Sequence, residues 1–238
     1  MKKKMLITGT TQGIGNEIYR QFKDEYEIIT INRRDFPGVN YICDLSDQNA
    51  IEAVCKLLYP MKIDVLINNA GGAAPVNFPD MTMEELFKCS VLNYHAPVML
   101  MQAVLEGMKE RGCGRIINIS SIASKSPRTA IPHYAAAKAA LESFTKSMAV
   151  AYTACGITIN SICPGGVETD TSLMNRRAMA RLSGKDTEFY NNHMRTGNGL
   201  GRMIQPGEVA ALIRFLLSDE ASSISGQSVN ICGIKEVH

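Results

Sequence analysis

Short apolar runs alternate with longer amphipathic segments along most of the chain. Apolar runs of about four to eight residues that end at turn-forming residues indicate buried strands, and a repeat near 3.6 residues indicates helices. This alternation predicts an α/β fold, a doubly wound parallel sheet with helices on both faces and a ligand crevice at the carboxyl ends of the strands. The expected strands are 5–8, 27–31, 40–43, 65–68, 115–120, 158–162 and 228–231, and the expected helices are 14–24, 48–58, 83–111, 132–154 and 207–218.

Two segments depart from a simple alternation. The amphipathic stretch 83–111 is long for one helix, and it predicts two consecutive helices or one helix bent near Asn93 and Pro97. The segment 165–201 is polar and has no clear sheet pattern. A stretch of this length without a strand pattern predicts a mobile lid.

The composition is that of an ordinary globular protein, with 45% hydrophobic and 20% charged residues. The length of 238 residues predicts a single domain, 1–238. A net charge of +2 gives no reason to expect nucleic acid or an anionic membrane as a partner. The sequence shows neither the apolar region of a signal peptide nor an apolar run long enough to cross a bilayer, so we expect a cytoplasmic protein.

The chain has seven cysteines, but it contains no Cys-x-x-Cys pair and no cluster of histidine and cysteine at the spacing of metal ligands. An odd number of scattered cysteines is typical of reduced, mostly buried thiols in the cytoplasm. We therefore expect neither disulfides nor a metal site.

Ser121, Tyr134 and Lys138 are the strongest candidates for chemistry. Ser121 follows a predicted buried strand, and Tyr134 and Lys138 lie one turn apart on a predicted helix. A tyrosine and a lysine at this spacing also occur by chance on solvated helix faces. Here alanines surround the pair and leave room for a ligand, so the arrangement favours proton transfer.

A glycine-rich turn lies between the first predicted strand and the first predicted helix, with glycines at positions 9, 13 and 15. Such a turn lets the backbone approach a pyrophosphate, whose charge is met by free N–H groups and the helix dipole. The spacing Gly-x-x-x-Gly-x-Gly differs from the Gly-x-Gly-x-x-Gly fingerprint. Its position between strand and helix nevertheless favours a dinucleotide site over an ordinary turn.

Together these motifs resemble the short-chain dehydrogenase/reductase family over nearly the whole chain. The family pattern Thr-Gly-x-x-x-Gly-x-Gly matches 8–15, Asn-Asn-Ala-Gly matches 68–71, and Pro-Gly matches 164–165. The resemblance implies a Rossmann domain with a seven-stranded sheet in the order 3-2-1-4-5-6-7. It also implies that the lid, 165–201, covers the substrate.

The resemblance implies a set of site residues. The catalytic set is Asn93, Ser121, Tyr134 and Lys138. The residues expected to bind the dinucleotide are Gly9, Thr11, Gln12, Gly13, Ile14, Asn32, Arg33, Asp44, Leu45, Asn69, Ala70, Gly71, Tyr134, Lys138, Pro164, Gly165, Val167 and Thr169.

The end of the second strand favours NADP(H) over NAD(H). Asn32 stands where NAD-preferring relatives carry an aspartate, and the Arg33 guanidinium can bind a 2′-phosphate. Asp35 is the alternative acidic residue, and Gln12 departs from the basic residue that many NADP-dependent relatives have. Asp44 matches the aspartate that contacts the adenine amine, and Asp44 or Ser46 could also cap the helix that follows.

The expected mechanism centres on Tyr134 as general acid in reduction or general base in oxidation. The Lys138 ammonium would lower the pKa of the tyrosine and hold the nicotinamide ribose. Ser121 would polarise the substrate carbonyl, with Ser120 as the competing serine. Asn93 would hold a water in a proton relay that leads from Lys138 to solvent.

The C-terminal segment 205–227 resembles the 3-oxoacyl-carrier-protein reductase branch, so the leading substrate is a 3-oxoacyl thioester or a related ketone. Residues 232–234 depart from the Asp-Gly-Gly turn of that branch. Arg176, Arg177 and Arg195 could meet a phosphopantetheine or a carrier protein, although a solvated lid face is the simpler interpretation. The alternatives are oxidation of a secondary alcohol or sugar, and an NADP(H)-sensing regulator without turnover.

The remaining polar and sulfur-containing candidates have simpler structural interpretations. We expect His133 to line the substrate pocket or the surface at a helix start, and His95 to pack near Asn93. We expect the methionines at 99, 101 and 108 to lie in the core or in a subunit contact. The resemblance implies a homo-oligomer, a dimer or tetramer that uses 83–111 and 132–154 as interfaces.

Overall fold

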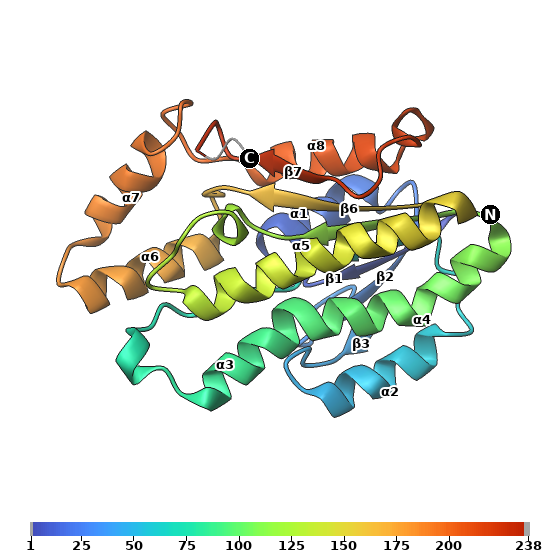
Figure 1. Cartoon of the computed structure of the whole chain (residues 1–238), viewed down its shortest axis with the longest axis horizontal. Coiled ribbons are helices and arrows are strands. Elements are labelled where there is room, and N and C mark those ends of the chain that lie inside the picture. Colours follow the sequence, from blue (N-terminus) through green and yellow to red (C-terminus); the bar gives the residue numbers. More distant parts are fainter. Residues whose placement is uncertain (1, 236–238) are drawn as a thin grey trace.

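The computed structural model describes residues 2–235 and contains a seven-stranded sheet in the order β3-β2-β1-β4-β5-β6-β7. Every neighbouring pair of strands is parallel. The fold class and strand order expected from the sequence are confirmed (Figure 1). The strands are β1 (Lys4–Thr8), β2 (Glu27–Asn32), β3 (Tyr41–Ile42), β4 (Val65–Asn68), β5 (Gly114–Ile119), β6 (Ile157–Pro164) and β7 (Ser228–Ile231).

Helices cover both faces of the sheet. Figure 1 shows α2, α4 and α5 in front of it and α1 and α8 behind it, while α6 and α7 stand beyond one end of the strands. The helices are α1 (Gly13–Phe22), α2 (Gln48–Leu58), α3 (Met83–Ser90), α4 (Ala96–Arg111), α5 (Pro132–Tyr152), α6 (Asp170–Ser183), α7 (Thr187–Thr196) and α8 (Pro206–Leu217).

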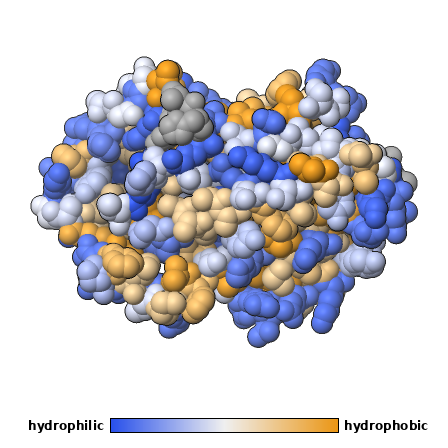
Figure 2. Space-filling model, viewed as in Figure 1, coloured by the Kyte–Doolittle hydropathy of each residue, from blue (hydrophilic) through white to orange (hydrophobic). Residues whose placement is uncertain are grey.

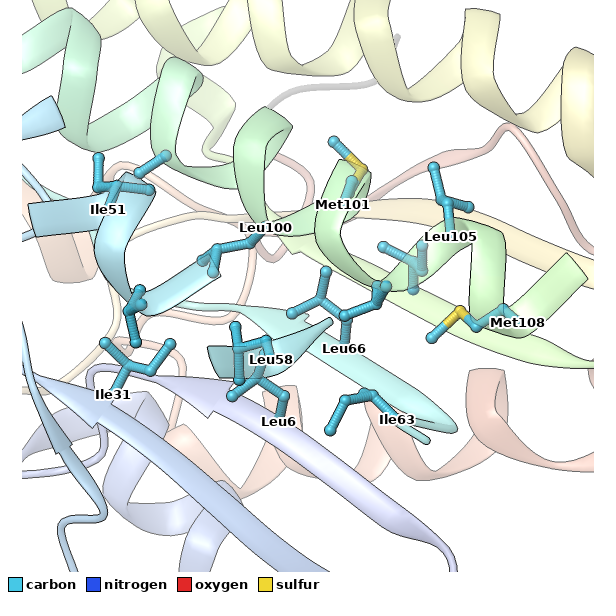
Figure 3. Close-up of a cluster of buried hydrophobic side chains, with 14 of the residues drawn as sticks. Leu6, Ile31, Ile51, Leu58, Ile63, Leu66, Leu100, Met101, Leu105 and Met108 are labelled. Carbon is cyan, nitrogen blue, oxygen red and sulfur yellow. The ribbon is translucent and has the colours of Figure 1, made fainter. Parts of the chain in front are cut away.

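The front layer buries a large apolar cluster between the sheet and the helices α2 and α4 (Figure 3). Leu6 and Leu66 project from adjacent strands, and they meet Leu58 and Leu100 from the two helices. Burial of each such side chain contributes roughly 1.5–3 kcal/mol. The methionines at 101 and 108 are fully buried here, and the one at 99 packs against the cluster, so the core interpretation is confirmed.

The back layer packs α1 and α8 against the opposite face of the same strands. Ile18 and Phe22 of α1 and Val209 and Ile213 of α8 are almost completely buried. Because both faces are covered, the central strands are apolar on both sides and do not alternate with polar residues. β1 is central, and its Ile7 lies beside Thr30 of β2 and Ile67 of β4.

The long amphipathic stretch is divided where the sequence predicted a change. A π-helical turn, Val91–His95, joins α3 to α4, and Asn93 lies in this turn. Pro97 lies in the first turn of α4, and since the preceding π turn is itself helical, its missing N–H interrupts the hydrogen bonds of a continuous helical stretch at this point. Such π turns often occur at functional sites.

The segment 165–201 has no strand, as the sequence pattern predicted, but it contains two helices that were not predicted, α6 and α7. Thr169 caps α6 by accepting a hydrogen bond from Ser172 N, and Asp186 caps α7 by accepting one from Phe189 N. The polar composition hid the helical period, although these caps are typical helix-start signals.

The seven cysteines lie within the described residues, where none forms a disulfide, and four of them are buried. Within residues 2–235, no helix is both long enough and apolar enough to cross a membrane.

Candidate active site

The predicted site residues gather at the carboxyl ends of β1, β4, β5 and β6. In a parallel sheet these ends share one edge, and the crevice beside it is the usual ligand position. α6 and α7 stand beyond this edge (Figure 1). The predicted site residues therefore lie at this sheet edge, on the side where α6 and α7 stand.

The glycine turn after β1 has the shape that an anion site requires. Gly9 and Gly13 have φ values of 74° and 58°, a region that side chains other than glycine rarely adopt. A Cβ on Gly15 would collide with the carbonyl oxygen of Gly9. The N-cap residue of α1, Gln12, makes no side-chain cap, so the first N–H groups of the helix remain available to an anion.

Asn69 and Thr8 join the ends of β1 and β4. The Asn69 amide donates to the carbonyl oxygens of Thr8 and Gly9, both at 2.9 Å. The backbone N–H groups of Asn69 and Ala70 donate to the Thr8 hydroxyl at 3.0 and 2.9 Å. These bonds fix the glycine turn against the neighbouring strand.

At the end of β2, Asn32 turns toward the glycine turn. Its side chain is buried, accepts from Thr10 N at 2.6 Å and donates to the Thr10 hydroxyl at 2.9 Å. Arg33 is exposed beside it, while Thr11, Ile14 and Leu45 line the turn and the adjacent loop.

Asp44 is ionised at this position. Burial would raise the pKa of its carboxyl, but hydrogen bonds from the Ser46 backbone and hydroxyl, together with the Arg33 charge, lower it. Neither Asp44 nor Ser46 caps α2, because Asp47 does so through Asn49 N and Ala50 N. The capping interpretation of Asp44 and Ser46 is therefore wrong.

Lys138, Tyr134 and Ser121 lie together. Lys138 is 2% exposed, and its Nζ donates to Ile119 O at 2.8 Å and lies 5.7 Å from the centre of the Tyr134 ring. The Tyr134 hydroxyl is hydrogen bonded with the Ser121 side chain. The Ser121 hydroxyl also accepts from Ala123 N at 3.1 Å, which orients it at the end of β5.

Asn93 approaches the same centre from the π turn. Its side chain exchanges two hydrogen bonds with the backbone of Gly72, both at 2.9 Å. A Cβ on Gly71 would lie 2.7 Å from Asn93 Oδ1 and 3.0 Å from Lys138 Nζ. Gly71 is thus the point where Asn93 and Lys138 converge, and a side chain there would separate them.

Burial governs the acid–base balance of Tyr134 and Lys138. It raises the pKa of Tyr134 to about 12, although the hydrogen bond with Ser121 acts in the opposite direction. Burial lowers the pKa of Lys138 to about 8. In both side chains desolvation disfavours the charged form, and the lowering of the tyrosine pKa by the Lys138 ammonium stays a prediction.

Glu142, which the sequence reasoning missed, lies one turn beyond Lys138 on α5 and is 6% exposed. It accepts hydrogen bonds from Ser120 Oγ at 2.8 Å, from Cys163 Sγ at 3.3 Å and from the Ser124 hydroxyl. Lys125 Nζ lies 3.4 Å from its other oxygen.

These contacts keep Glu142 ionised. Burial would raise the pKa of its carboxyl, but the hydrogen bonds from Ser124, Ser120 and Cys163 and the Lys125 charge lower it. Ser120 therefore faces away from Tyr134 and toward Glu142, while Ser121 faces Tyr134. The signal in the sequence was a carboxylate at the fourth residue after Lys138, on the same helix face.

The chain from the end of β6 to α6 passes beside the glycine turn, and it contains Pro164, Gly165, Val167 and Thr169. Gly165 N donates to Ile231 O at 3.0 Å, and Val167 pairs with Ile204. The methyl group of Thr169 would lie 3.2 Å from a Cβ on Gly13. The Gln12 amide donates to the Thr171 hydroxyl at 2.7 Å, so α6 begins directly over the turn.

Three charged or titratable residues lie differently from their interpretation. His133 begins α5 but is buried, and burial lowers the pKa of its ring, so a surface position is wrong. Arg176 is 4% exposed, so it does not belong to a solvated lid face. His95 is exposed, and its ring contacts the edge of Tyr94.

A family model described as short chain dehydrogenase matches residues 3–180 of this chain. The 3-oxoacyl-(acyl-carrier-protein) reductase of Vibrio cholerae serotype O1 is 30% identical over 97% of this chain and 96% of its own length.

Two solved structures share the fold. Actinorhodin polyketide ketoreductase, solved as a variant with NADPH, has a TM-score of 0.88 and 28% identity, and it covers 98% of this chain and 96% of its own. A 4-hydroxyisoleucine dehydrogenase complexed with NADH has a TM-score of 0.83 and 25% identity over 98% of both chains.

Proposed function

This chain belongs to the short-chain dehydrogenase family, whose members oxidise CH–OH groups or reduce carbonyls with NAD(P), and from that premise we propose the NADPH-dependent reduction of a ketone. The proposed substrate is a 3-oxoacyl thioester or a related biosynthetic ketone. The observation that carries the proposal is the contact of the Tyr134 hydroxyl with Ser121, beside the buried Lys138.

The residues around the glycine turn fit a dinucleotide. The first N–H groups of α1 have no side-chain cap and are available to an anion. Gly15 lets the turn pack closely, because a Cβ there would collide with the Gly9 carbonyl oxygen. The turn would hold the diphosphate, Asp44 the adenine amine and Lys138 the nicotinamide ribose. Thr169 would close over the diphosphate from the lid side. When bound, the nicotinamide supplies the hydride.

NADP(H) is the proposed form because the end of β2 offers no carboxylate to a ribose hydroxyl. Asn32 bonds to Thr10 at this position, and the exposed Arg33 follows it. A guanidinium can bind a 2′-phosphate through two hydrogen bonds. NAD(H) is the less favoured alternative, with Asp35 as the acidic residue.

The proton chemistry of this site suits reduction. A Tyr134 hydroxyl with a pKa of about 12 holds its proton at neutral pH and can donate it to the alkoxide that forms. Ser121 would donate a hydrogen bond to the substrate oxygen, which disperses the charge that develops there. Lys138 and Asn93 meet at Gly71, where a relayed proton would restore the phenol.

The test is a fluorescence titration of the purified protein with NADPH and NADH, followed by a rate assay with an acetoacetyl thioester. We expect NADPH to bind at least about tenfold more tightly than NADH, which corresponds to about 1.4 kcal/mol. Consumption of NADPH on addition of the thioester would support ketone reduction. Tighter binding of NADH than of NADPH would contradict the assignment of Arg33 to the 2′-phosphate. If neither cofactor binds, the proposed enzyme activity is wrong.

Oxidation of a secondary alcohol or sugar is the second candidate, because the same four residues can run the reaction in either direction. A regulator without turnover is the least supported candidate, because it would not need the convergence of Asn93 and Lys138 at Gly71.

We propose a homo-oligomer, a dimer or tetramer, that forms through α4 and α5. A groove of about 310 Å³ runs between these helices, and Figure 2 shows apolar residues over the middle of this face. Light scattering on the wild type and on Met148→Glu tests this interface. The groove is lined by Val98, Met101, Gln102, Leu105, Glu106, Phe144, Met148 and Tyr152.

We also propose that residues 1–238 act as one domain with 165–201 as its substrate-covering segment, and that the protein works in the cytoplasm. The odd number of scattered cysteines, four of them buried, is typical of proteins in a reducing compartment.

A further inference from the structure

Two cationic side chains in residues 2–235 are almost wholly buried: Lys138 at 2% exposure and Arg176 at 4%. Lys138 belongs to the proposed catalytic set, which accounts for its burial. Arg176 lies on α6, outside that set, and the proposed reaction does not use it. A buried charge that no carboxylate accompanies is costly, so its presence requires an explanation.

The contacts of Arg176 are all with neutral groups. Its Nη1 donates to the Ser172 hydroxyl at 2.9 Å and lies 3.4 Å from the Met203 sulfur. Its Nε is buried and has no hydrogen-bond partner. Burial lowers the pKa of the guanidinium, and the charge of Arg195 adds to this effect. The side chain therefore has an unused donor, and its positive charge has no carboxylate in direct contact, although Glu168 lies near enough to raise its pKa.

Arg176 lines a cavity of about 230 Å³ between α6 and α7. Arg195 reaches the cavity from α7, and Asn191 lines it with an Oδ1 that is also buried without a partner. Leu173 supplies an apolar wall. The two guanidinium groups are the donors that an oxyanion needs. The Asn191 Oδ1 is an acceptor, and the Asn191 amide nitrogen already donates to Glu188 at 2.9 Å, so this oxygen would accept a hydrogen bond only from a protonated or hydroxyl-bearing group.

Two carboxylates also line this cavity, and they limit what it can bind. Glu168 and Asp170 are exposed, and neither forms an ion pair with Arg176 within 4.0 Å in the described part of the chain. Glu168 acts on Arg176 only as a nearby charge that raises its pKa. Because both carboxylates face solvent, their charges are screened more strongly than the buried guanidinium is.

The cavity adjoins the proposed active site. Thr169, which also lines it, contacts Gly13 of the glycine turn. α6 and α7 stand beyond the sheet edge at which Ser121 and Tyr134 lie (Figure 1). A ligand that reaches Tyr134 from this side would extend its far end toward Arg176.

We infer that the cavity between α6 and α7 binds the oxyanion, a carboxylate or phosphate, at the far end of the substrate, with Arg176 as its main partner. The inference rests on the proposed ketone reduction and narrows its substrate class to anionic ketones. Arg195 provides the second positive charge.

The first experiment measures anion binding without any reaction. Thermal unfolding is followed during a titration with glutarate, in the presence of saturating NADPH so that the glycine turn is occupied. Glutarate should raise the unfolding temperature of the wild type, whereas dimethyl glutarate should not. Arg176→Met should lose this rise, and Arg177→Met, a matched change of the exposed neighbouring arginine, should retain it.

The second experiment measures specificity with methyl ketones that carry a terminal carboxylate at increasing chain length, each compared with its methyl ester. For the best length, Arg176→Met should lower kcat/KM for the acid by at least about tenfold through KM and leave the ester unchanged. Arg195→Met should act in the same direction with a smaller effect. Since Arg195 is half exposed, this variant keeps the test valid if Arg176→Met fails to fold.

Three outcomes would overturn the inference. In the first, Arg176→Met lowers kcat/KM equally for the acid and the ester, and Glu168→Gln does the same. Arg176 would then be a structural partner of Glu168. Weaker NADPH binding by Arg176→Met would assign the oxyanion to the cofactor. The absence of glutarate binding by the wild type would remove the site. If glutarate binds and no ketone is reduced, the proposed function fails while the oxyanion site stands.

Discussion

The β5–α5 region and the α6–α7 lid each bury one cation, but the two cations have different partners. Lys138 donates to Ile119 O and has the ionised Glu142 one helical turn away. Arg176 has a hydroxyl and a sulfur as partners and an Nε with none. Lys138 is therefore held between a backbone carbonyl and a nearby carboxylate, whereas Arg176 has no carboxylate in direct contact and an unused donor. Under the proposals above, the first region carries the proton chemistry and the second selects the substrate.

Ser121→Ala should give the largest effect among the variants that sharpen this contrast. It removes the hydrogen bond to the developing oxyanion, so kcat should fall by about 100- to 1000-fold with little change in NADPH binding. Steady-state kinetics with an acetoacetyl thioester measure it. Ser120→Ala is the matched control, and a larger loss there than in Ser121→Ala would exchange the roles of the two serines.

Arg33→Ala should have the next largest effect, and only on the cofactor. Loss of a charge-assisted contact to the 2′-phosphate should weaken NADPH binding by about 10- to 100-fold and leave NADH binding unchanged. Arg34→Ala serves as the control at the neighbouring position. Parallel weakening of both cofactors would show that Arg33 supports the loop and not the phosphate.

Glu142→Gln should destabilise the region around β5 and α5 and leave α6 and α7 unchanged. The buried Lys125 contact and the hydrogen bonds of the carboxylate weaken, so the free energy of unfolding should fall by about 1–3 kcal/mol. We also expect kcat to fall by roughly tenfold, because Ser120 and Ser124 next to Ser121 lose their anchor. Denaturant unfolding and kinetics measure the two effects. Unchanged kcat would separate the Glu142 network from catalysis.

The same variant gives a pH dependence. The pKa of Glu142 is lowered in the folded protein, so its ionised form contributes stability above the unfolded pKa. This contribution is lost as the pH falls through the folded pKa. The stability difference between the wild type and Glu142→Gln should therefore shrink below about pH 4.5. A constant difference down to pH 3 would contradict the lowered pKa.

Thr169→Ala should give the smallest effect, and it tests the lid. Loss of the α6 cap should cost about 1 kcal/mol of local stability. Hydrogen exchange should rise in α6 and remain unchanged in α5. Equal changes in both helices would mean that the lid and the catalytic side unfold as one unit.

The catalytic side was the more predictable of the two regions. The glycine turn and the Tyr134–Lys138 pair follow from short-range spacing, and the structure brings them to one sheet edge. Glu142 was missed because its importance depends on Ser120, Ser124 and Cys163, which only the folded chain brings together.

The lid was less predictable because its helices carry many polar residues, which blur the apolar repeat. Thr169 and Asp186 were readable caps. The burial of Arg176 was not readable, since an arginine among polar residues normally faces solvent. The N-cap of α2 was also not predictable from the sequence. Asp44, Ser46 and Asp47 all precede the helix, and only Asp47 caps it.

The central claim is that proton transfer depends on Tyr134 on α5. The direct test is the rate of NADPH consumption by Tyr134→Phe with an acetoacetyl thioester, with NADPH binding measured on the same sample. We predict unchanged binding and a rate about 100- to 10,000-fold below the wild type, the range expected for loss of a general acid. A rate close to the wild type with intact binding would contradict the assignment of Tyr134.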